Sequence, residues 1–280
     1  MIRIGFVDYY LDEWHANNYP AWIAEASGGE MQVTCAWAQL PHPVTGMTPA
    51  QWCEQYGVEH CESLEELIQK SDCLVVLSPD DCQMHEELSK LPLASGKPTY
   101  VDKTFSPDLA SGRRIFAMAQ AGNTPCWSSS ALRFAAEYAP VDRDGIVAAS
   151  FWGPGNYETY AIHQLEPLMM LVDTPAVQVM YLPGEDWYQL NVRFADGRSG
   201  SISGYAKGSP WLANFAGREK NTCIRVESDF FRAFIRELVE FFRTGKVCVS
   251  PEQTLRIMAV REAGLRAQSC PGQWVDVEAV

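Results

Sequence analysis

Lys103 is the first residue in this chain whose type and place suggest chemistry. It lies two residues past the apolar core of a short strand, within the segment Gly96–Phe105. At the ligand-binding edge of a sheet, a lysine ammonium can hydrogen-bond a substrate hydroxyl and share in the transfer of its proton. The alternative is a surface lysine paired with Asp102, and the sequence by itself favours that alternative.

His163 is the second candidate for proton transfer. In a helix, Glu166 falls one turn after His163 and Tyr160 one turn before it, so the three side chains share a face. A histidine with an adjacent carboxylate is a usual general acid–base arrangement. A buried, hydrogen-bonded histidine with a structural role is the alternative. Cysteine or histidine partners at metal-ligand spacing are absent, so we expect no metal.

Arg133 follows the last strand of the first half of the chain. Its guanidinium could clamp a substrate or brace an interface between two domains, and both interpretations stay open. After an earlier strand, Ser78 and Pro79 could cover a nicotinamide or a ribose together with His85. The alternative for that segment is a helix cap followed by a solvated helix face.

The turn after the first strand lacks the glycine pattern of dinucleotide-binding proteins. In G-x-G-x-x-G the glycines let backbone amides approach a pyrophosphate, but here the only glycine, Gly5, lies within the strand. Asp8, Asp12 and Glu13 would place carboxylates near a phosphate, which lowers affinity unless they point away. The acidic residue expected to hold a ribose is also missing, because Trp37 stands at the end of the second strand. A degenerate nucleotide site is therefore an alternative.

The first half of the chain alternates predicted strands and helices, which is typical of a parallel sheet covered on both faces. The predicted strands are Ile2–Val7, Met31–Leu40, Cys73–Leu77, Pro98–Val101 and Pro125–Trp127, and the helices are Tyr19–Ala26, a short one after a capping box at Ser63–Glu66, one through Leu93, and Pro107–Ala121. Right-handed crossovers would bring the carboxyl ends of the strands to one edge, where ligands bind.

The second half has runs of strands with few helices, which predicts an α+β domain with a mostly antiparallel sheet. The predicted strands are Gly145–Trp152, Val177–Leu182, Tyr188–Phe194, Arg198–Tyr205 and Thr222–Val226, and the helices are Thr159–Val172, Ser228–Arg243 and Pro251–Gln268. Ala195–Gly197 is a hairpin signal. We therefore predict an α/β protein with two domains, residues 1–125 and 126–280.

Composition limits the partners and the compartment. The net charge of −13 disfavours nucleic acid and anionic membrane surfaces as partners. No apolar run reaches membrane length, and the first one is too short for a signal peptide. The nine cysteines are an odd number without metal spacing, which favours reduced thiols and a cytoplasmic location.

Taken together, these segments resemble the Gfo/Idh/MocA oxidoreductase family, which includes glucose–fructose oxidoreductase and inositol dehydrogenase. Gly96–Phe105 matches the family's G-K-x-x-x-x-E-K-P segment, with Asp102 for Glu and Thr104 for Pro. Ala161–Glu166 matches its G-x-H-x-x-D segment, with Glu166 for Asp. The resemblance extends over nearly the whole chain.

The resemblance implies a Rossmann domain followed by a domain with an open antiparallel sheet, whose outer face often makes oligomers such as dimers or tetramers. It implies NAD or NADP as the cofactor and a carbohydrate-like small molecule as the substrate. Lys103 and His163 match the family's catalytic lysine and histidine. The family's usual aspartate, four residues before its histidine, corresponds to Thr159 in this chain. Glu158 or Glu166 would have to replace it. The candidate residues for cofactor contact are Val7, Asp8, Tyr9, Trp37, Ser78, Pro79 and Asp102, and those for substrate contact are Arg133 and Tyr160.

The leading hypothesis is an NAD(P)-dependent oxidoreductase acting on a sugar or cyclitol hydroxyl or ketone. The missing glycine pattern motivates a second hypothesis, a binding or regulatory protein that has lost hydride transfer. A third is non-redox chemistry, such as elimination or epimerisation of a keto-sugar with the same lysine and histidine.

Overall fold

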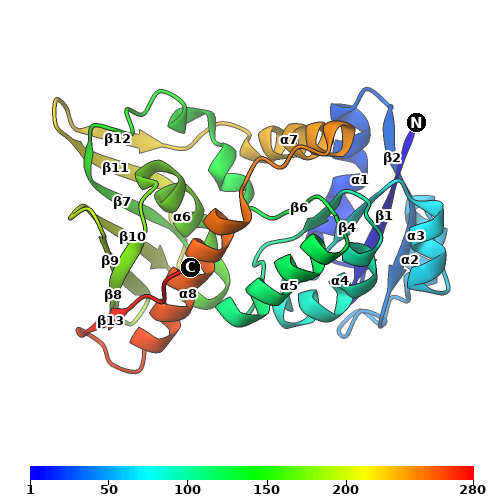
Figure 1. Cartoon of the computed structure of the whole chain (residues 1–280), viewed down its shortest axis with the longest axis horizontal. Helices are drawn as coiled ribbons and strands as arrows, with labels where there is room; N and C mark the ends of the chain where they lie inside the picture. The colour runs from blue at the N-terminus through cyan, green and yellow to red at the C-terminus, as the bar shows by residue number, and fades with distance from the viewer. The chain divides into compact units, whose positions relative to one another are not determined.

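The computed structural model describes all 280 residues, and the chain forms two compact units (Figure 1). The first unit contains Met1–Ser129 and Phe234–Pro251, and the second contains Ser130–Ala233 and Glu252–Val280. One unit holds a parallel sheet and the other a mostly antiparallel sheet. The predicted fold class is therefore confirmed.

Six parallel strands form the sheet of the first unit, in the order β3-β2-β1-β4-β5-β6. Their bounds are β1 Ile2–Asp8, β2 Met31–Ala38, β3 Glu59–His60, β4 Cys73–Val76, β5 Thr99–Val101 and β6 Cys126–Trp127. The central strands are buried, as their continuous apolar runs predict. The strand order reverses between β1 and β4, and ligands of such sheets bind beyond the carboxyl ends of the strands at this point.

Helices cover this sheet, and most of them match the predicted ones. They are α1 Trp14–Ala26, α2 Pro49–Tyr56, α3 Leu64–Lys70, α4 His85–Ala94 and α5 Leu109–Ala121, joined by the later part of α7 Phe230–Thr244. Phe234 of α7 contacts the rings of Tyr19 and Trp127. Two details differ from the prediction. Helix α1 begins at Trp14, before the predicted Tyr19, and α2 was not predicted.

Gly5 has a packing role within β1. A Cβ atom at this position would lie 2.2 Å from the hydroxyl of Ser71 and 2.8 Å from the side chain of Leu67. The lone glycine of this segment therefore lets α3 approach the sheet closely.

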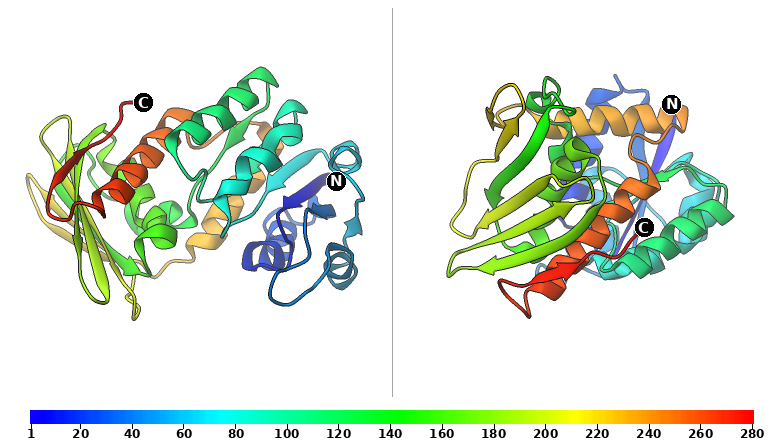
Figure 2. Two further views of the ribbon diagram at one scale, coloured as in Figure 1. Left: turned by 90° about the horizontal axis from the view of Figure 1, so that it is seen from below. Right: turned by 60° about the vertical axis from the view of Figure 1, so that its left-hand side comes forward.

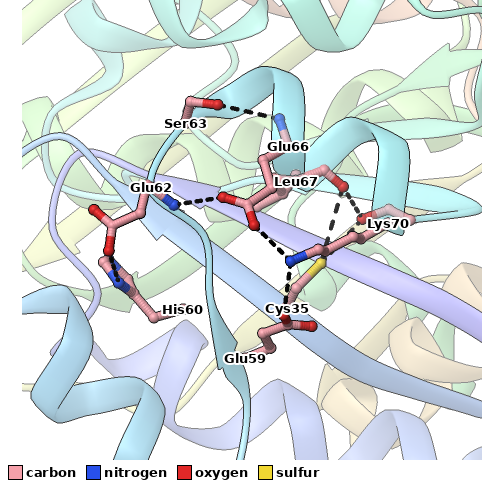
Figure 3. A network of polar contacts seen from close by, with 9 residues as sticks. Cys35, Glu59, His60, Glu62, Ser63, Glu66, Leu67 and Lys70 are labelled. Atoms are coloured by element: carbon pink, nitrogen blue, oxygen red, sulfur yellow. Dashed lines mark hydrogen bonds and ion pairs between the residues drawn. The ribbon is translucent and has the colours of Figure 1, made fainter.

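The predicted capping box at the start of α3 is half formed. The Ser63 hydroxyl accepts from the Glu66 amide at 3.2 Å, as predicted, but the Glu66 carboxylate accepts from the amide of Glu62 (Figure 3). The same carboxylate binds the Lys70 ammonium, which also binds Glu59 of β3 at 2.6 Å. This network joins α3 to the edge of the sheet.

Seven strands form the sheet of the second unit, in the order β12-β11-β7-β10-β9-β8-β13. Their bounds are β7 Ile146–Pro154, β8 Ala176–Pro183, β9 Trp187–Phe194, β10 Ser199–Tyr205, β11 Leu212–Gly217, β12 Thr222–Arg225 and β13 Trp274–Asp276. All neighbours are antiparallel except β7 and β10. The predicted hairpin between β9 and β10 is confirmed, with Gly197 at φ 87°. Strands β11 and β13 were not predicted.

Helices α6 Tyr157–Val172 and α8 Pro251–Ala267 lie on the same face of this sheet, and the other face carries no helix (Figure 2). The buried side of α6 includes Leu165 and Leu168. No helix in the chain combines the length and the hydrophobicity needed to cross a membrane. None of the nine cysteines forms a disulfide.

Candidate functional site

Asp8 ends β1 at the point where the strand order of the first unit reverses. Its side chain is fully buried, and its Oδ1 accepts a hydrogen bond from the Tyr9 amide at 2.7 Å. Its Oδ2 is buried without a hydrogen-bond partner. Burial and then the charge of Glu13 raise the pKa of Asp8 well above its ordinary value. The carboxyl group that the sequence placed near a phosphate therefore turns back onto its own turn.

Glu13 caps the amino end of α1 with its own carboxylate. Its Oε2 accepts from the His15 amide at 2.6 Å, and its Oε1 accepts from the Ala16 amide. These groups belong to the first turn of a helix, where amides have no partner within the helix. This cap explains why α1 begins earlier than predicted. The usual cap residues Ser, Thr, Asp and Asn are absent from this position, so the sequence carries no strong signal for the cap.

Glu13 is 6% exposed, so its charge is poorly solvated. Burial raises the pKa of Glu13, the charge of His15 opposes that shift and the charge of Asp102 adds to it, and the pKa lies at about 7. A glutamate cap that titrates near neutral pH is unusual for a helix end.

His15 forms an ion pair with Asp102, a contact that the sequence analysis missed. The Nδ1 atom of His15 contacts Oδ2 of Asp102, and the Tyr100 hydroxyl donates to Oδ1 at 3.2 Å. Burial raises the pKa of Asp102, but the charge and hydrogen bond of His15 and then the charge of Lys103 outweigh burial and hold it at about 2. The ring of Tyr19 stacks on His15 at 4.9 Å. The contact joins residues 87 positions apart, which no local sequence signal indicates.

Lys103 directly follows Asp102, beyond the end of β5, and is half-buried. The ion-pair partner of Asp102 is His15, not Lys103. Ser78 follows β4 at the same edge of the sheet, with φ 88°, a conformation that residues other than glycine rarely adopt. His85 is fully buried, and its Nδ1 lies 3.1 Å from the Phe105 carbonyl, so the alternative of a solvated helix face does not hold at His85.

The remaining candidates for cofactor contact lie at the ends of strands in the same unit. Val7 is fully buried in β1, Tyr9 follows that strand, and Trp37 is half-buried near the end of β2. Pro79 is the second residue of the turn after β4. The parallel sheet brings the ends of β1, β4 and β5 to one edge because these strands are neighbours.

The second unit positions His163 in α6. The Nδ1 atom of His163 lies 2.7 Å from the Ser130 hydroxyl. The rings of Tyr160 and Trp211 contact the imidazole edge-on, with centroids 5.4 and 5.7 Å from it. Tyr160 is exposed and His163 is half-buried. The imidazole is therefore held by one hydroxyl and two aromatic rings, and it stays partly exposed.

Two glycines of the β7 end make room for these aromatic rings. A Cβ atom at Gly153 would lie 2.1 Å from the Trp211 ring, and one at Gly155 would lie 2.3 Å from the Tyr160 ring. Gly155 also has φ +87°. Trp211 was not among the sequence candidates, because it stands in a segment that had no predicted element.

Glu166 is not at the surface beside His163 but is 3% exposed and paired with Arg133. Nη1 of Arg133 lies 2.8 Å from Oε2 of Glu166, and its Nη2 contacts Oε1 of Gln253 in α8. Arg133 is itself buried. The pair thus joins the segment after β6 to α6 and α8, all within the second unit.

Glu158, the other acidic candidate near His163, also has a hydrogen-bond partner. Oε1 of Glu158 accepts from Gln268 at 2.8 Å, and the Thr159 hydroxyl donates to the helix cap Asn156. No three histidine, cysteine, aspartate or glutamate side chains of the chain gather in a way that could hold a metal ion.

The β1–α1 turn does not fit a dinucleotide's diphosphate in the arrangement that the structure describes. A helix amino terminus binds phosphate through free first-turn amides. Here Glu13 takes the amides of His15 and Ala16, and Asp8 takes that of Tyr9. Two buried carboxyl groups thus stand where an anion would have to approach.

Comparison with known proteins extends this description. Residues 10–129 match the model of a family described as an oxidoreductase family with an NAD-binding Rossmann fold. No curated protein sequence matches the chain.

Solved structures share the fold over nearly the whole chain. A myo-inositol 2-dehydrogenase from Lactobacillus plantarum has a TM-score of 0.80 at 14% identity and covers 99% of each chain. A probable dehydrogenase from Thermotoga maritima has a TM-score of 0.81 at 14% identity, covering 98% of each. An Agrobacterium radiobacter oxidoreductase, in complex with NAD⁺, L-tartaric acid and magnesium, has a TM-score of 0.78 at 11% identity, covering 98% of each.

Glu13→Gln should remove a pH dependence of stability. Because the pKa of Glu13 is raised from 4.5 to about 7, the native protein binds more protons than the unfolded chain over this window. The free energy of unfolding therefore falls as pH rises, by up to about 1.4 kcal/mol per pH unit from this proton. Urea denaturation at several pH values measures the slope. Glu25→Gln, at an exposed position of α1, should keep the wild-type slope, and an unchanged slope in Glu13→Gln would contradict the assignment.

Breaking the buried Arg133–Glu166 pair should be costly. We expect Glu166→Leu to lower the free energy of unfolding by about 3–5 kcal/mol, because a buried guanidinium loses its carboxylate. The double variant Arg133→Met, Glu166→Leu should recover much of the loss, since no charge is left without its partner. Equal losses in the single and double variants would show that the pair has no such role.

Ser130→Ala should alter the tautomer balance of His163, because it removes the hydroxyl that contacts Nδ1. Nitrogen-15 NMR of the imidazole measures this, with the signals assigned by comparison with His163→Asn. Ser130→Thr keeps a hydroxyl and should resemble the wild type. Identical His163 spectra in the alanine variant and the wild type would argue against positioning by Ser130.

Proposed function

We propose that this chain, which belongs to the Gfo/Idh/MocA oxidoreductase family, oxidises or reduces a hydroxyl or ketone of a sugar, cyclitol or related molecule, with NAD or NADP as its cofactor. The family predicted from the sequence is confirmed, and the match of residues 10–129 supports the NAD-binding class. The inositol dehydrogenases among the similar structures support a polyhydroxy substrate.

The observation that carries this proposal is the setting of His163. Its Nδ1 is held by Ser130, and Tyr160 and Trp211 contact its ring. Aromatic faces are apolar surfaces on which the C–H side of a sugar or cyclitol ring can rest. An imidazole in contact with these rings is suited to exchange a proton with a hydroxyl of that ring.

In this proposal Lys103 and His163 keep the catalytic roles that the family resemblance implies. The Lys103 ammonium hydrogen-bonds a substrate oxygen and stabilises negative charge on it. With Nδ1 held by Ser130, Nε2 of His163 is the atom that takes or returns the hydroxyl proton. Tyr160 and Trp211 orient the ring that carries the oxygen.

One observation favours a second candidate function. The β1–α1 turn holds two carboxyl groups on the amides that a diphosphate would need. A binding or regulatory protein, or a lyase or epimerase without net redox chemistry, would not require that diphosphate. Product analysis without added cofactor separates the lyase and epimerase from the other two candidates.

Two further proposals concern assembly and location. The sheet face without helices carries small side chains, including Ala148, Ser150 and Ser201, around a depression of about 490 Å³ next to Trp274. We propose that this face makes a homodimer or homotetramer, which light scattering after size exclusion would test. A cytoplasmic location stays a prediction from the nine thiols.

Lys103→Ala tests the catalytic proposal. We expect turnover to fall by roughly two to four orders of magnitude, because the ammonium that stabilises the reacting oxygen is lost. The assay follows dinucleotide absorbance with myo-inositol, scyllo-inositol and aldoses. Lys90→Ala, at an exposed lysine of α4, should keep wild-type turnover.

Near-wild-type turnover in Lys103→Ala would reject the role of that lysine. Calorimetric titration with NAD⁺, NADH, NADP⁺ and NADPH tests the cofactor separately. No heat and no thermal shift with any of the four would favour the second candidate function.

A further inference from the structure

We propose that Glu13 is a built-in competitor for the cofactor's diphosphate, so that a dinucleotide binds through the β1–α1 turn only when the Glu13 carboxylate leaves the amides of α1. This inference rests on the proposed function and concerns the affinity of the same site. It reconciles a sequence that matches an NAD-binding family with a turn that holds two carboxyl groups.

The Glu13 side chain occupies two amides in the first turn of α1. Oε2 of Glu13 accepts from the His15 amide at 2.6 Å, and Oε1 accepts from the Ala16 amide. A phosphate at a helix amino terminus would use these same donors, because they point out of the first turn. The two oxygens of one carboxylate thus accept the hydrogen bonds that two phosphate oxygens would otherwise accept.

Asp8 extends this occupation to the preceding loop. Its Oδ1 accepts from the Tyr9 amide at 2.7 Å, and its Oδ2 is buried with no hydrogen-bond partner. Asp8 and Glu13 together therefore take amides on both sides of the turn. A dinucleotide approaching this turn would meet carboxyl oxygens where the glycine-rich pattern offers bare N–H groups.

Glu13 competes effectively for these amides because it belongs to the same chain. A group on the same chain acts at a high effective concentration, so a ligand in solution must displace it at a cost in affinity. The burial of Glu13 adds to this cost, because its two hydrogen bonds are shielded from water. Its negative charge also repels a diphosphate directly. All three effects act on cofactor affinity without involving the candidate catalytic residues Lys103 and His163.

The test measures binding to the full-length protein by calorimetry, with NADH, NADPH and inorganic pyrophosphate as probes at pH 8. Glu13→Gln removes the negative charge and keeps the size of the side chain. Glu13→Ala removes the charge and also frees both amides. Glu25→Gln on the same helix is the matched control, and thermal unfolding shows that each variant is folded. If Glu13→Ala does not fold, Glu13→Gln decides the test.

We expect NADH or NADPH to bind the Glu13 variants at least about tenfold more tightly than the wild type, and Glu25→Gln to match the wild type. Equal dinucleotide affinity in the wild type and the Glu13 variants would overturn the inference and leave the proposed oxidoreductase standing. No binding in any variant would also overturn it, since freeing the turn would then create no site. Tighter binding in the Glu13 variants, but no turnover with any substrate, would support the inference and count against the proposed function.

Discussion

The amides of His15 and Ala16 in the first turn of α1 must be paired, because both residues are buried and an unpaired buried N–H group is costly. The Glu13 carboxylate accepts hydrogen bonds from the amides of His15 and Ala16. The positions of other residues at this sheet edge depend on that pairing. The cap starts α1 at Trp14, which places the His15 ring against Asp102. The ion pair in turn keeps a buried carboxylate charged at the end of β5, directly before Lys103.

The two units contribute different kinds of chemistry to the proposed enzyme. The first unit gathers buried acidic groups near the strand ends, where His15 pairs with Asp102 and the charge of Lys103 helps to lower the pKa of Asp102. In the second unit, Ser130 and two aromatic rings contact His163, and Arg133 and Glu166 form a buried charge pair. The two sets of contacts use different residues, so the charge pair does not engage the imidazole.

Local signals made most of the fold predictable. The apolar run Cys73–Leu77 and the hairpin signal Ala195–Gly197 each specify one element within a few residues. Strand β11 was missed because Leu212–Gly217 lacks the β-branched residues that mark strands. The site was harder, because its decisive contacts are non-local. The sequence showed Asp102 and His15 as separate residues, and only the fold brings them together.

Nuclear magnetic resonance of Glu13 tests the central interaction most directly. The account predicts that the side-chain carboxyl carbon of Glu13 titrates near pH 7 and that the amide signals of His15 and Ala16 shift over the same pH range, because the groups are hydrogen-bonded. A Glu13 titration at its ordinary value of 4.5, with no accompanying change in the two amides, would contradict it.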